Sequence, residues 1–310
     1  MTRGFRTDGE ITRESLVRSL TLTLKSLALK KLPASTLQVL REWAWTLRGQ
    51  SQGPTKPIDL GLLRLLRETS LAALTDAHFL EEKLLPQLGL NDEGLAQLPE
   101  ELFPFCGRGL RIWQYPNQFG PYLALLGRLG LRSYLEIGVR HGGTFVCTVE
   151  YLSRFQLLRA AVAVDLNPCA SFMKYAKRNP LCRFLQTDSH APAFREFFER
   201  GEPFDLALID GDHSEAGCWE DFTLVREKAS VLAFHDISSD AVPGVGAVWR
   251  KVQQTCADDY EFFEFTAQYP SVAARTGQRF LGIGVAVPKR LAAQAAAPPE
   301  FGIWRDDALD

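Results

Sequence analysis

From Tyr134 onward, short apolar runs alternate with longer stretches in which apolar residues recur every three or four positions. The short runs predict strands, and the longer stretches predict helices. Strands that alternate with helices in this way form a parallel sheet with helices on both faces. We therefore expect a doubly wound α/β fold whose first five strands lie at residues 134–138, 161–165, 183–187, 204–210 and 231–236.

Two further apolar segments, residues 260–266 and 280–287, follow without a clear helix between them. Such a pair is typical of antiparallel strands. The complete prediction is therefore a sheet of seven strands, most of them parallel.

The first hundred residues predict helices instead. Leu recurs at mixed three- and four-residue spacing over residues 12–32 and 34–48, a linker follows at 49–57, and two or three more helices are expected up to residue 103. We expect residues 1–104 to be a helical cap or a dimerisation region through which the chain forms homo-oligomers, with a substrate lid as the alternative. Residues 105–288 would form the sheet domain, and residues 289–310 a loosely held tail.

The segment Tyr134-Leu-Glu-Ile-Gly-Val-Arg-His-Gly-Gly-Thr144 predicts a strand, a glycine turn and a helix start. Gly138 permits a tight turn, and Gly142 and Gly143 would keep side chains away from a ligand. The helix that begins near Thr144 offers free N–H groups to an anion. Because Arg140 replaces the second glycine of G-x-G-x-x-G, the turn fits a ligand without a pyrophosphate better than NAD.

The pattern Glu136-x-Gly138-x-x-x-Gly142-Gly143-Thr144 resembles the first motif of class I S-adenosylmethionine-dependent methyltransferases. Later strand ends at Asp165 and Asp188 strengthen the resemblance, which covers roughly residues 110–287. It implies a Rossmann-like methyltransferase fold with an N-terminal helical region, and S-adenosylmethionine as cofactor. The implied cofactor-binding residues are Glu136, Gly138, Gly142, Gly143, Thr144, Asp165 and Asp188.

The segments Ile209-Asp-Gly-Asp-His-Ser214 and His235-Asp236 are more narrowly similar to a subgroup of small-molecule O-methyltransferases. This subgroup is related to macrolide-sugar methyltransferases and to cephalosporin hydroxylase-like proteins. The resemblance implies Asp210, His235 and Asp236 as ligands of a divalent cation, Mg²⁺ or Mn²⁺, with Asp210 and His213 as catalytic residues and His213 as the base.

The residues themselves also raise the question of a metal. If the fourth and fifth strands are neighbours, Asp210 and Asp236 end side by side, and two close carboxylates repel each other unless a cation or a shared proton intervenes. His235 stands where the subgroup more often has an acid. A nitrogen ligand suits manganese, iron or zinc better than magnesium, which prefers oxygen.

Several of these residues also have a purely structural interpretation. Asp165 could cap the next helix or a turn, and Asp188 could be the N-cap of the helix around Phe194. Glu136 could anchor the backbone of the turn. His141 and His190 fit local turn or surface positions, and the glycines of Pro243-Gly-Val-Gly246 suggest a flexible rim beside the substrate.

Composition narrows the classes of function. The 310-residue chain is 46% hydrophobic and carries a formal net charge of only −2, so nucleic acid is not expected as a partner. Its six cysteines form no C-x-x-C pair, which argues against a zinc knuckle or a disulfide framework. Charges interrupt the apolar run near the N-terminus, so we expect no signal peptide, no membrane insertion and a cytoplasmic location.

The leading hypothesis is a methyltransferase that acts on a hydroxyl of a small-molecule or sugar acceptor, with a cation assisting. One alternative is a protein that binds S-adenosylmethionine without catalysing a reaction. The other is a hydroxylase-like relative, which would need oxygen and a redox-active metal.

Overall fold

The structure is a computed structural model that describes residues 55–167 and 169–296. The chain divides into two compact units, residues 1–53 and residues 54–310. The expected helices at 12–32 and 34–48, and the tail beyond residue 296, lie outside the described residues. The expected boundary between residues 104 and 105 falls inside the second unit, and the roles assigned to residues 1–104 stay predictions.

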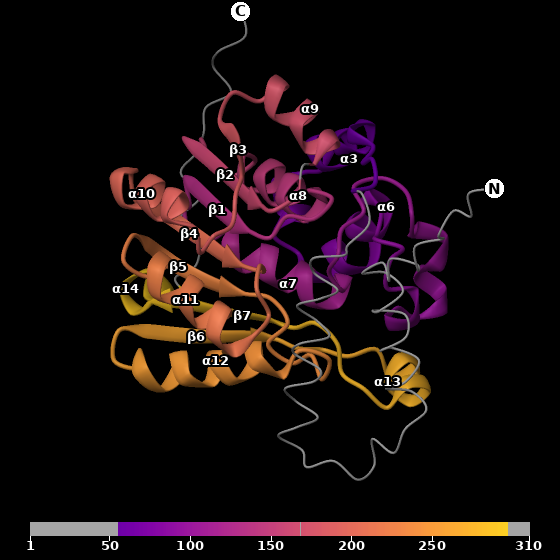
Figure 1. Cartoon of the computed structure of the whole chain (residues 1–310). Helices are drawn as coiled ribbons and strands as arrows, with labels where there is room; N and C mark the ends of the chain where they lie inside the picture. Colours follow the sequence, from indigo (N-terminus) through magenta and orange to yellow (C-terminus); the bar gives the residue numbers. More distant parts are fainter. Residues whose placement is uncertain (1–54, 168, 297–310) are drawn as a thin grey trace, which may run out of the picture. The chain divides into compact units, whose positions relative to one another are not determined.

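The described residues form a seven-stranded sheet with strand order β3-β2-β1-β4-β5-β7-β6 (Figure 1). Neighbouring strands are parallel, except that β7 runs antiparallel to both β5 and β6. The predicted fold class is therefore confirmed, and the fourth and fifth strands are neighbours, the condition on which Asp210 and Asp236 were expected to end side by side. The strands are β1 (Ser133–Ile137), β2 (Ala160–Asp165), β3 (Cys182–Gln186), β4 (Phe204–Ile209), β5 (Ala229–Phe234), β6 (Tyr260–Phe265) and β7 (Ile283–Pro288).

Two hydrophobic cores cover the two faces of this sheet, because successive strand residues point to opposite sides. Leu135 and Ile137 belong to the core that contains buried side chains of α10, α11 and α12. Tyr134 belongs to the other core, with α7, α8 and α9. These helices are α7 (Pro116–Leu126), α8 (Gly143–Leu152), α9 (Ala170–Arg178), α10 (Pro192–Arg200), α11 (Glu215–Val225) and α12 (Pro243–Thr255).

The connection between the last two strands differs from the prediction. A short helix, α13 (Pro270–Thr276), separates β6 from β7, where no clear helix was expected. The helix is short and buries only Val272, so its sequence lacks the apolar periodicity from which a helix is predicted. After β7 the chain continues into α14 (Lys289–Ala296).

Residues 55–112 pack on the α7 and α8 side of the sheet as short helical pieces and loops. Leu90 forms isolated bridges with Cys106 and Ile112, and α7 has its most extensive helix contacts with η3. No helix within the described residues is long and apolar enough to cross a membrane. The main pieces are η2 (Leu60–Leu62), α3 (Leu63–Glu68), α4 (Leu71–Leu74), α5 (Ala77–Phe79), η3 (Leu80–Leu84), α6 (Leu85–Leu88), η4 (Leu95–Gln97) and η5 (Glu100–Phe105).

Candidate active site at the carboxyl edge of the sheet

The glycine turn after β1 lies where the strand order reverses, the usual position of ligands in doubly wound sheets. Gly138 has φ +87°, as expected for a residue that permits a tight turn. Its N–H donates to the carbonyl of Val164 at 2.8 Å, and a Cβ at Gly138 would lie 2.0 Å from the carbonyl oxygen of Asp210. Glycine is therefore required because the ends of β1, β2 and β4 meet at this point.

Asp165, at the end of β2, binds the backbone of the same turn. Its Oδ2 accepts N–H groups from Val139 at 3.0 Å and Arg140 at 2.8 Å, and its Oδ1 accepts the N–H of Asn167 at 2.8 Å. These bonds match the structural alternative of a turn cap. A carboxylate offers about four acceptor positions, so one position remains for a ligand hydroxyl.

Glu136 lies in the core and not at the surface of the turn. Its side chain is buried on the same face as Tyr134, whose hydroxyl donates a hydrogen bond to it. Burial, together with the negative charges of Asp210 and Asp165, raises the pKa of Glu136 well above its ordinary value, although the Tyr134 bond opposes this shift. Glu136 therefore favours the neutral acid, a hydrogen-bond donor behind the turn.

The two glycines at the start of α8 are packed closely against other parts of the protein. Gly142 is the left-handed N-cap with φ +83°, and a Cβ on it would touch Phe172 at 3.1 Å. A Cβ on Gly143 would lie 1.8 Å from the carbonyl oxygen of Leu110. Both glycines thus allow close packing of the protein itself, and the expectation that they also clear space for a ligand stays a prediction. Thr144 is buried in the first turn of α8.

Asp188 follows β3 at the same edge of the sheet. Its side chain is 54% exposed, and Oδ1 accepts the backbone N–H of His190 at 2.9 Å. The N-cap of α10 is Ala191, so the interpretation of Asp188 as that cap is wrong. An exposed acid at the end of β3 is free to contact a ligand through its remaining acceptor positions, which keeps the predicted cofactor contact open.

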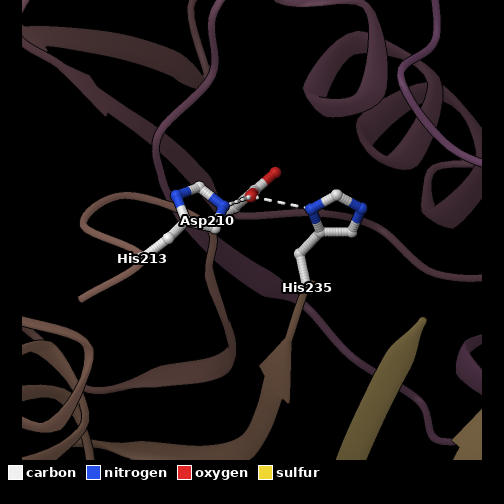
Figure 2. A group of neighbouring side chains, drawn as sticks. All are labelled: Asp210, His213 and His235. Atoms are coloured by element: carbon white, nitrogen blue, oxygen red, sulfur yellow. Dashed lines mark hydrogen bonds and ion pairs between the residues drawn. The ribbon is translucent and has the colours of Figure 1, made fainter. Parts of the chain in front are cut away.

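A cluster of acids and histidines follows β4 and β5 (Figure 2). Asp210 Oδ1 lies 2.8 Å from His235 Nδ1 and 3.2 Å from His213 Nε2. The same His213 nitrogen lies 3.2 Å from Asp236 Oδ2, so it bridges the two carboxylates. The ligand atoms of Asp210, His213 and His235 all lie within 4.8 Å of one another, and Asp236 contacts this group from outside.

The two histidines of this cluster change the electrostatics predicted for the site. Burial opposes the charged form of His213, but its bonds to Asp210 and Asp236 outweigh burial and raise its pKa to about 10. Burial also lowers the pKa of His235, and the same two acids reverse that effect and raise it. Although burial raises the pKa of Asp210, the histidines bring it below its ordinary value. Protonated His213 thus supplies the positive charge that two close carboxylates require.

Asp236 itself adopts an unusual backbone conformation. Its φ is +63°, a left-handed value that costs a non-glycine residue about 1–2 kcal/mol. Within the described residues, Asp236 Oδ1 and His235 Nε2 are buried and have no hydrogen-bond partner. Buried polar atoms without partners are rare in proteins, and strained residues gather at functional sites.

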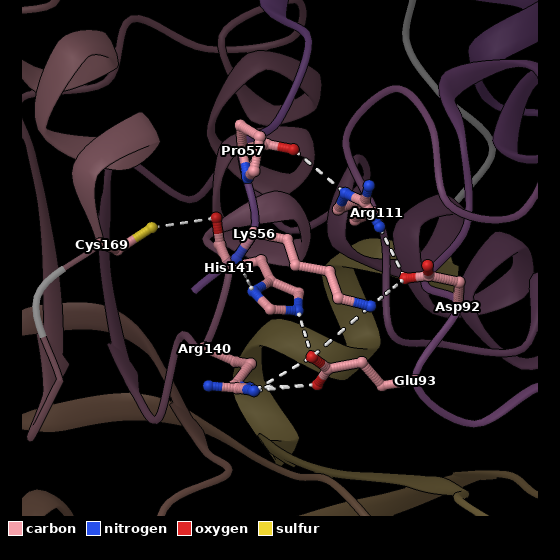
Figure 3. Close-up of polar contacts among 8 residues, drawn as sticks. All are labelled: Lys56, Pro57, Asp92, Glu93, Arg111, Arg140, His141 and Cys169. Carbon is pink, nitrogen blue, oxygen red and sulfur yellow. Dashed lines mark hydrogen bonds and ion pairs between the residues drawn. The ribbon is translucent and has the colours of Figure 1, made fainter. Parts of the chain in front are cut away.

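A second charged cluster covers the outer side of the glycine turn (Figure 3). Glu93 Oε2 lies 3.0 Å from Arg140 Nη2, and Glu93 Oε1 lies 3.3 Å from His141 Nε2. The backbone N–H of Lys56 donates to His141 Nδ1 at 3.0 Å. Burial lowers the pKa of His141 to about 4, so the ring is neutral and can accept that bond.

The same cluster contains a second acid. Asp92 Oδ1 accepts from Lys56 Nζ at 2.9 Å and from Arg111 Nη1 at 2.6 Å. We call the residues Lys56, Asp92, Glu93, Arg111, Arg140 and His141 the turn clasp. His141 lies in the turn, as one of its two interpretations expected, but the surface interpretation is wrong, since its side chain is 2% exposed. The six residues are spread from position 56 to position 141, so no local pattern predicted their pairing, and only the fold brought them together.

The segment 243–246 also differs from its prediction. It forms the first turn of α12, where a Cβ on Gly244 would lie 2.6 Å from the Glu215 nitrogen and one on Gly246 would lie 2.8 Å from the Ile237 carbonyl oxygen. These glycines serve close packing of a helix, not a flexible rim.

Comparison with known proteins found one family model and several solved structures to which the chain is similar. Residues 135–237 match a family model described as "Methyltransferase domain". The O-methyltransferase from Bacillus cereus in complex with SAH is 15% identical with a TM-score of 0.41, covering 73% of this chain and 97% of that one. The O-methyltransferase TomG from Streptomyces achromogenes, involved in tomaymycin synthesis and solved with SAM, is 17% identical with a TM-score of 0.40, covering 71% and 91%. No curated protein sequence matches the chain.

Proposed function

We propose that this chain is an S-adenosylmethionine-dependent methyltransferase that transfers a methyl group to a hydroxyl oxygen of a small molecule or sugar. The observation that carries the proposal is the position of Asp165 and Asp210. They end the strands on either side of β1, so both border the glycine turn. The narrower sequence resemblance to small-molecule O-methyltransferases supports the oxygen acceptor.

The residues present fit the cofactor. Asp165 keeps one acceptor position for a ribose hydroxyl, and exposed Asp188 lies at the adjacent strand end. When bound, S-adenosylmethionine supplies an electrophilic methyl group on a sulfonium. The protein has to bring the acceptor oxygen into line with that carbon at about 3–3.5 Å, which can provide several kcal/mol of the barrier.

The acceptor hydroxyl must also lose its proton, and His213 is the proposed base. In the arrangement observed, His213 holds a proton between Asp210 and Asp236 and cannot accept another. A cation or a substrate that neutralises these carboxylates would lower the pKa of His213 toward neutrality. Base catalysis of this kind contributes typically 10²–10⁴-fold.

The cluster fits a divalent cation. Asp210, His213 and His235 bring oxygen and nitrogen donors together, and buried His235 Nε2 and Asp236 Oδ1 have no partner within the described residues. Asp210, His235 and Asp236 are the proposed ligands, with His213 as the base. When bound, the cation would polarise the acceptor hydroxyl. The nitrogen donors favour manganese over magnesium.

The experiment measures radiolabelled methyl transfer by the full-length protein to a panel of hydroxylated acceptors, together with thermal shifts induced by S-adenosylhomocysteine. Asp210→Asn should lower transfer at least about a hundredfold and abolish any stabilisation by Mn²⁺. The matched control is Asp258→Asn, an exposed acid after α12. Absence of a thermal shift with S-adenosylhomocysteine would refute the proposed function. Activity unchanged by EDTA would refute the proposed role of a cation.

One observation favours a second candidate function. Two histidines and one carboxylate converge, and this ligand set is also typical of non-haem iron oxygenases. A hydroxylase would consume oxygen and a reductant, whereas a methyltransferase would not. Product formation that requires Fe²⁺ and air, and proceeds without S-adenosylmethionine, would establish the hydroxylase instead.

A further inference from the structure

A cavity of about 630 Å³ begins one residue beyond Asp236. It is bordered by the loop after β5 at Ile237 and Asp240, by α12 at Arg250, by Glu264 of β6 and by Arg279. Small-molecule sites commonly enclose 300–1,000 Å³. Because its wall includes Ile237, which directly follows Asp236, the cavity lies near the same edge of the sheet as the proposed catalytic cluster.

The walls of this cavity are held in place by the backbone. Asp240 donates its N–H to the carbonyl of Arg279 at 3.0 Å, and Ser238 donates its N–H to the carbonyl of Leu281 at 3.0 Å. A Cβ on Gly282 would lie 2.4 Å from Ser238 Oγ, so the two loops are in close contact. The cavity is therefore preformed, as ligand sites usually are.

Both acids in the wall already have partners. Asp240 Oδ1 lies 2.9 Å from Arg279 Nη2, and its Oδ2 accepts the Arg279 backbone N–H at 2.8 Å. Glu264 Oε1 accepts from Trp249 Nε1 at 2.6 Å and from Gln253 Nε2 at 2.8 Å. Arg279 balances the charge of Asp240, and two neutral donors occupy acceptor positions of Glu264.

Arg250 is the exception among the charged residues of the wall. Its side chain is exposed, and it forms no hydrogen bond or ion pair with any residue in the ranges 55–167 and 169–296. A guanidinium presents paired donors whose geometry matches a carboxylate. The cavity thus offers one guanidinium whose donors have no partner among the described residues.

We infer that this cavity binds the acceptor through a carboxylate that pairs with Arg250, so the substrate is a hydroxylated carboxylic acid. The inference rests on the proposed function, because it assumes that the molecule in the cavity presents its hydroxyl to the cluster at Asp210 and His213.

The test compares protocatechuate and catechol, which share a pair of ring hydroxyls and differ by one carboxylate. Binding of each to the full-length protein is measured by calorimetry with saturating S-adenosylhomocysteine. We expect protocatechuate to bind at least about tenfold more tightly than catechol, as for a charge-assisted pair. Arg250→Gln should bring the two affinities together and leave the affinity for S-adenosylhomocysteine unchanged.

The control is Arg200→Gln, an exposed arginine at the end of α10 that pairs with Glu196. It should keep the wild-type preference. Equal affinities for the two probes in the wild type, no binding of either, or a preference that survives Arg250→Gln would overturn the inference. S-adenosylhomocysteine binding is measured separately, so failure of the cavity assignment is distinguishable from failure of the methyltransferase proposal.

Discussion

Replacing Gly138 by alanine should damage the fold and the candidate site together. Gly138 has φ +87°, and its ideal Cβ position lies 2.0 Å from the Asp210 carbonyl oxygen and 2.9 Å from the Gly211 nitrogen. Real Cβ atoms essentially never approach other atoms more closely than 3.0 Å. Since both contacts are with backbone, the β4 end that carries Asp210 would have to move.

Two other glycines separate the contributions to this effect. Gly130 has φ +66° and no atom within 4 Å of its Cβ position, so Gly130→Ala measures the conformational cost alone, about 1–2 kcal/mol. Gly143 lacks a positive φ, but its Cβ would lie 1.8 Å from the Leu110 carbonyl oxygen, so Gly143→Ala measures overpacking, about 1–3 kcal/mol or more. Gly138→Ala combines both costs, which together amount to about 2–5 kcal/mol.

The assay is urea unfolding of the three variants and the wild type, followed by calorimetric binding of S-adenosylhomocysteine to those that fold. We expect Gly138→Ala to be the least stable or tied with Gly143→Ala, and to lose measurable binding. Gly130→Ala should bind like the wild type. If Gly138→Ala is no less stable than Gly130→Ala, the close approach of the β1 and β4 ends is not a constraint and the reasoning is wrong.

Three further predictions concern charged groups. Glu93→Gln should destabilise the protein by about 1–3 kcal/mol and weaken S-adenosylhomocysteine binding, because it breaks the pairs with Arg140 and His141; Glu82→Gln, at an exposed pair with His78, should have little effect in the same unfolding and binding assays. In chelator-treated protein, NMR titration should show a pKa near 10 for His213, and Asp236→Asn should lower it by removing one bonded carboxylate; an unchanged value would contradict the bridging geometry. The Asp221 carboxylate raises the pKa of His190 from 6.5 to about 9, although burial opposes this. The resulting stabilisation should be complete below about pH 6.5 and disappear as the pH rises through 9, so denaturation across this range should show a flatter profile for His190→Gln.

Local pattern was enough to predict the sheet. Strands β1 to β5 alternate with helices along the chain. Each strand was recognisable from an apolar run and each helix from its periodicity, because both signals depend only on residues close in sequence. The same rule missed α13, which buries only Val272. Strand ends were predictable too, and because parallel strands share a carboxyl edge, Asp165 and Asp210 were expected at the same edge; the strand order then placed them on either side of β1.

Only the fold determined the contacts between segments that are distant in the sequence. The amino-acid sequence placed His213 three residues after Asp210, but only the pairing of β4 with β5 put its ring between Asp210 and Asp236 and raised its pKa. His141 meets Lys56 across 85 positions, a relation that no local periodicity encodes. Sequence thus determined which chemical groups reach the sheet edge. Tertiary packing determined their partners and their protonation, because burial and charge pairing depend on neighbours in space. It also determined the close approach of Leu110 that leaves no room for a side chain at Gly143.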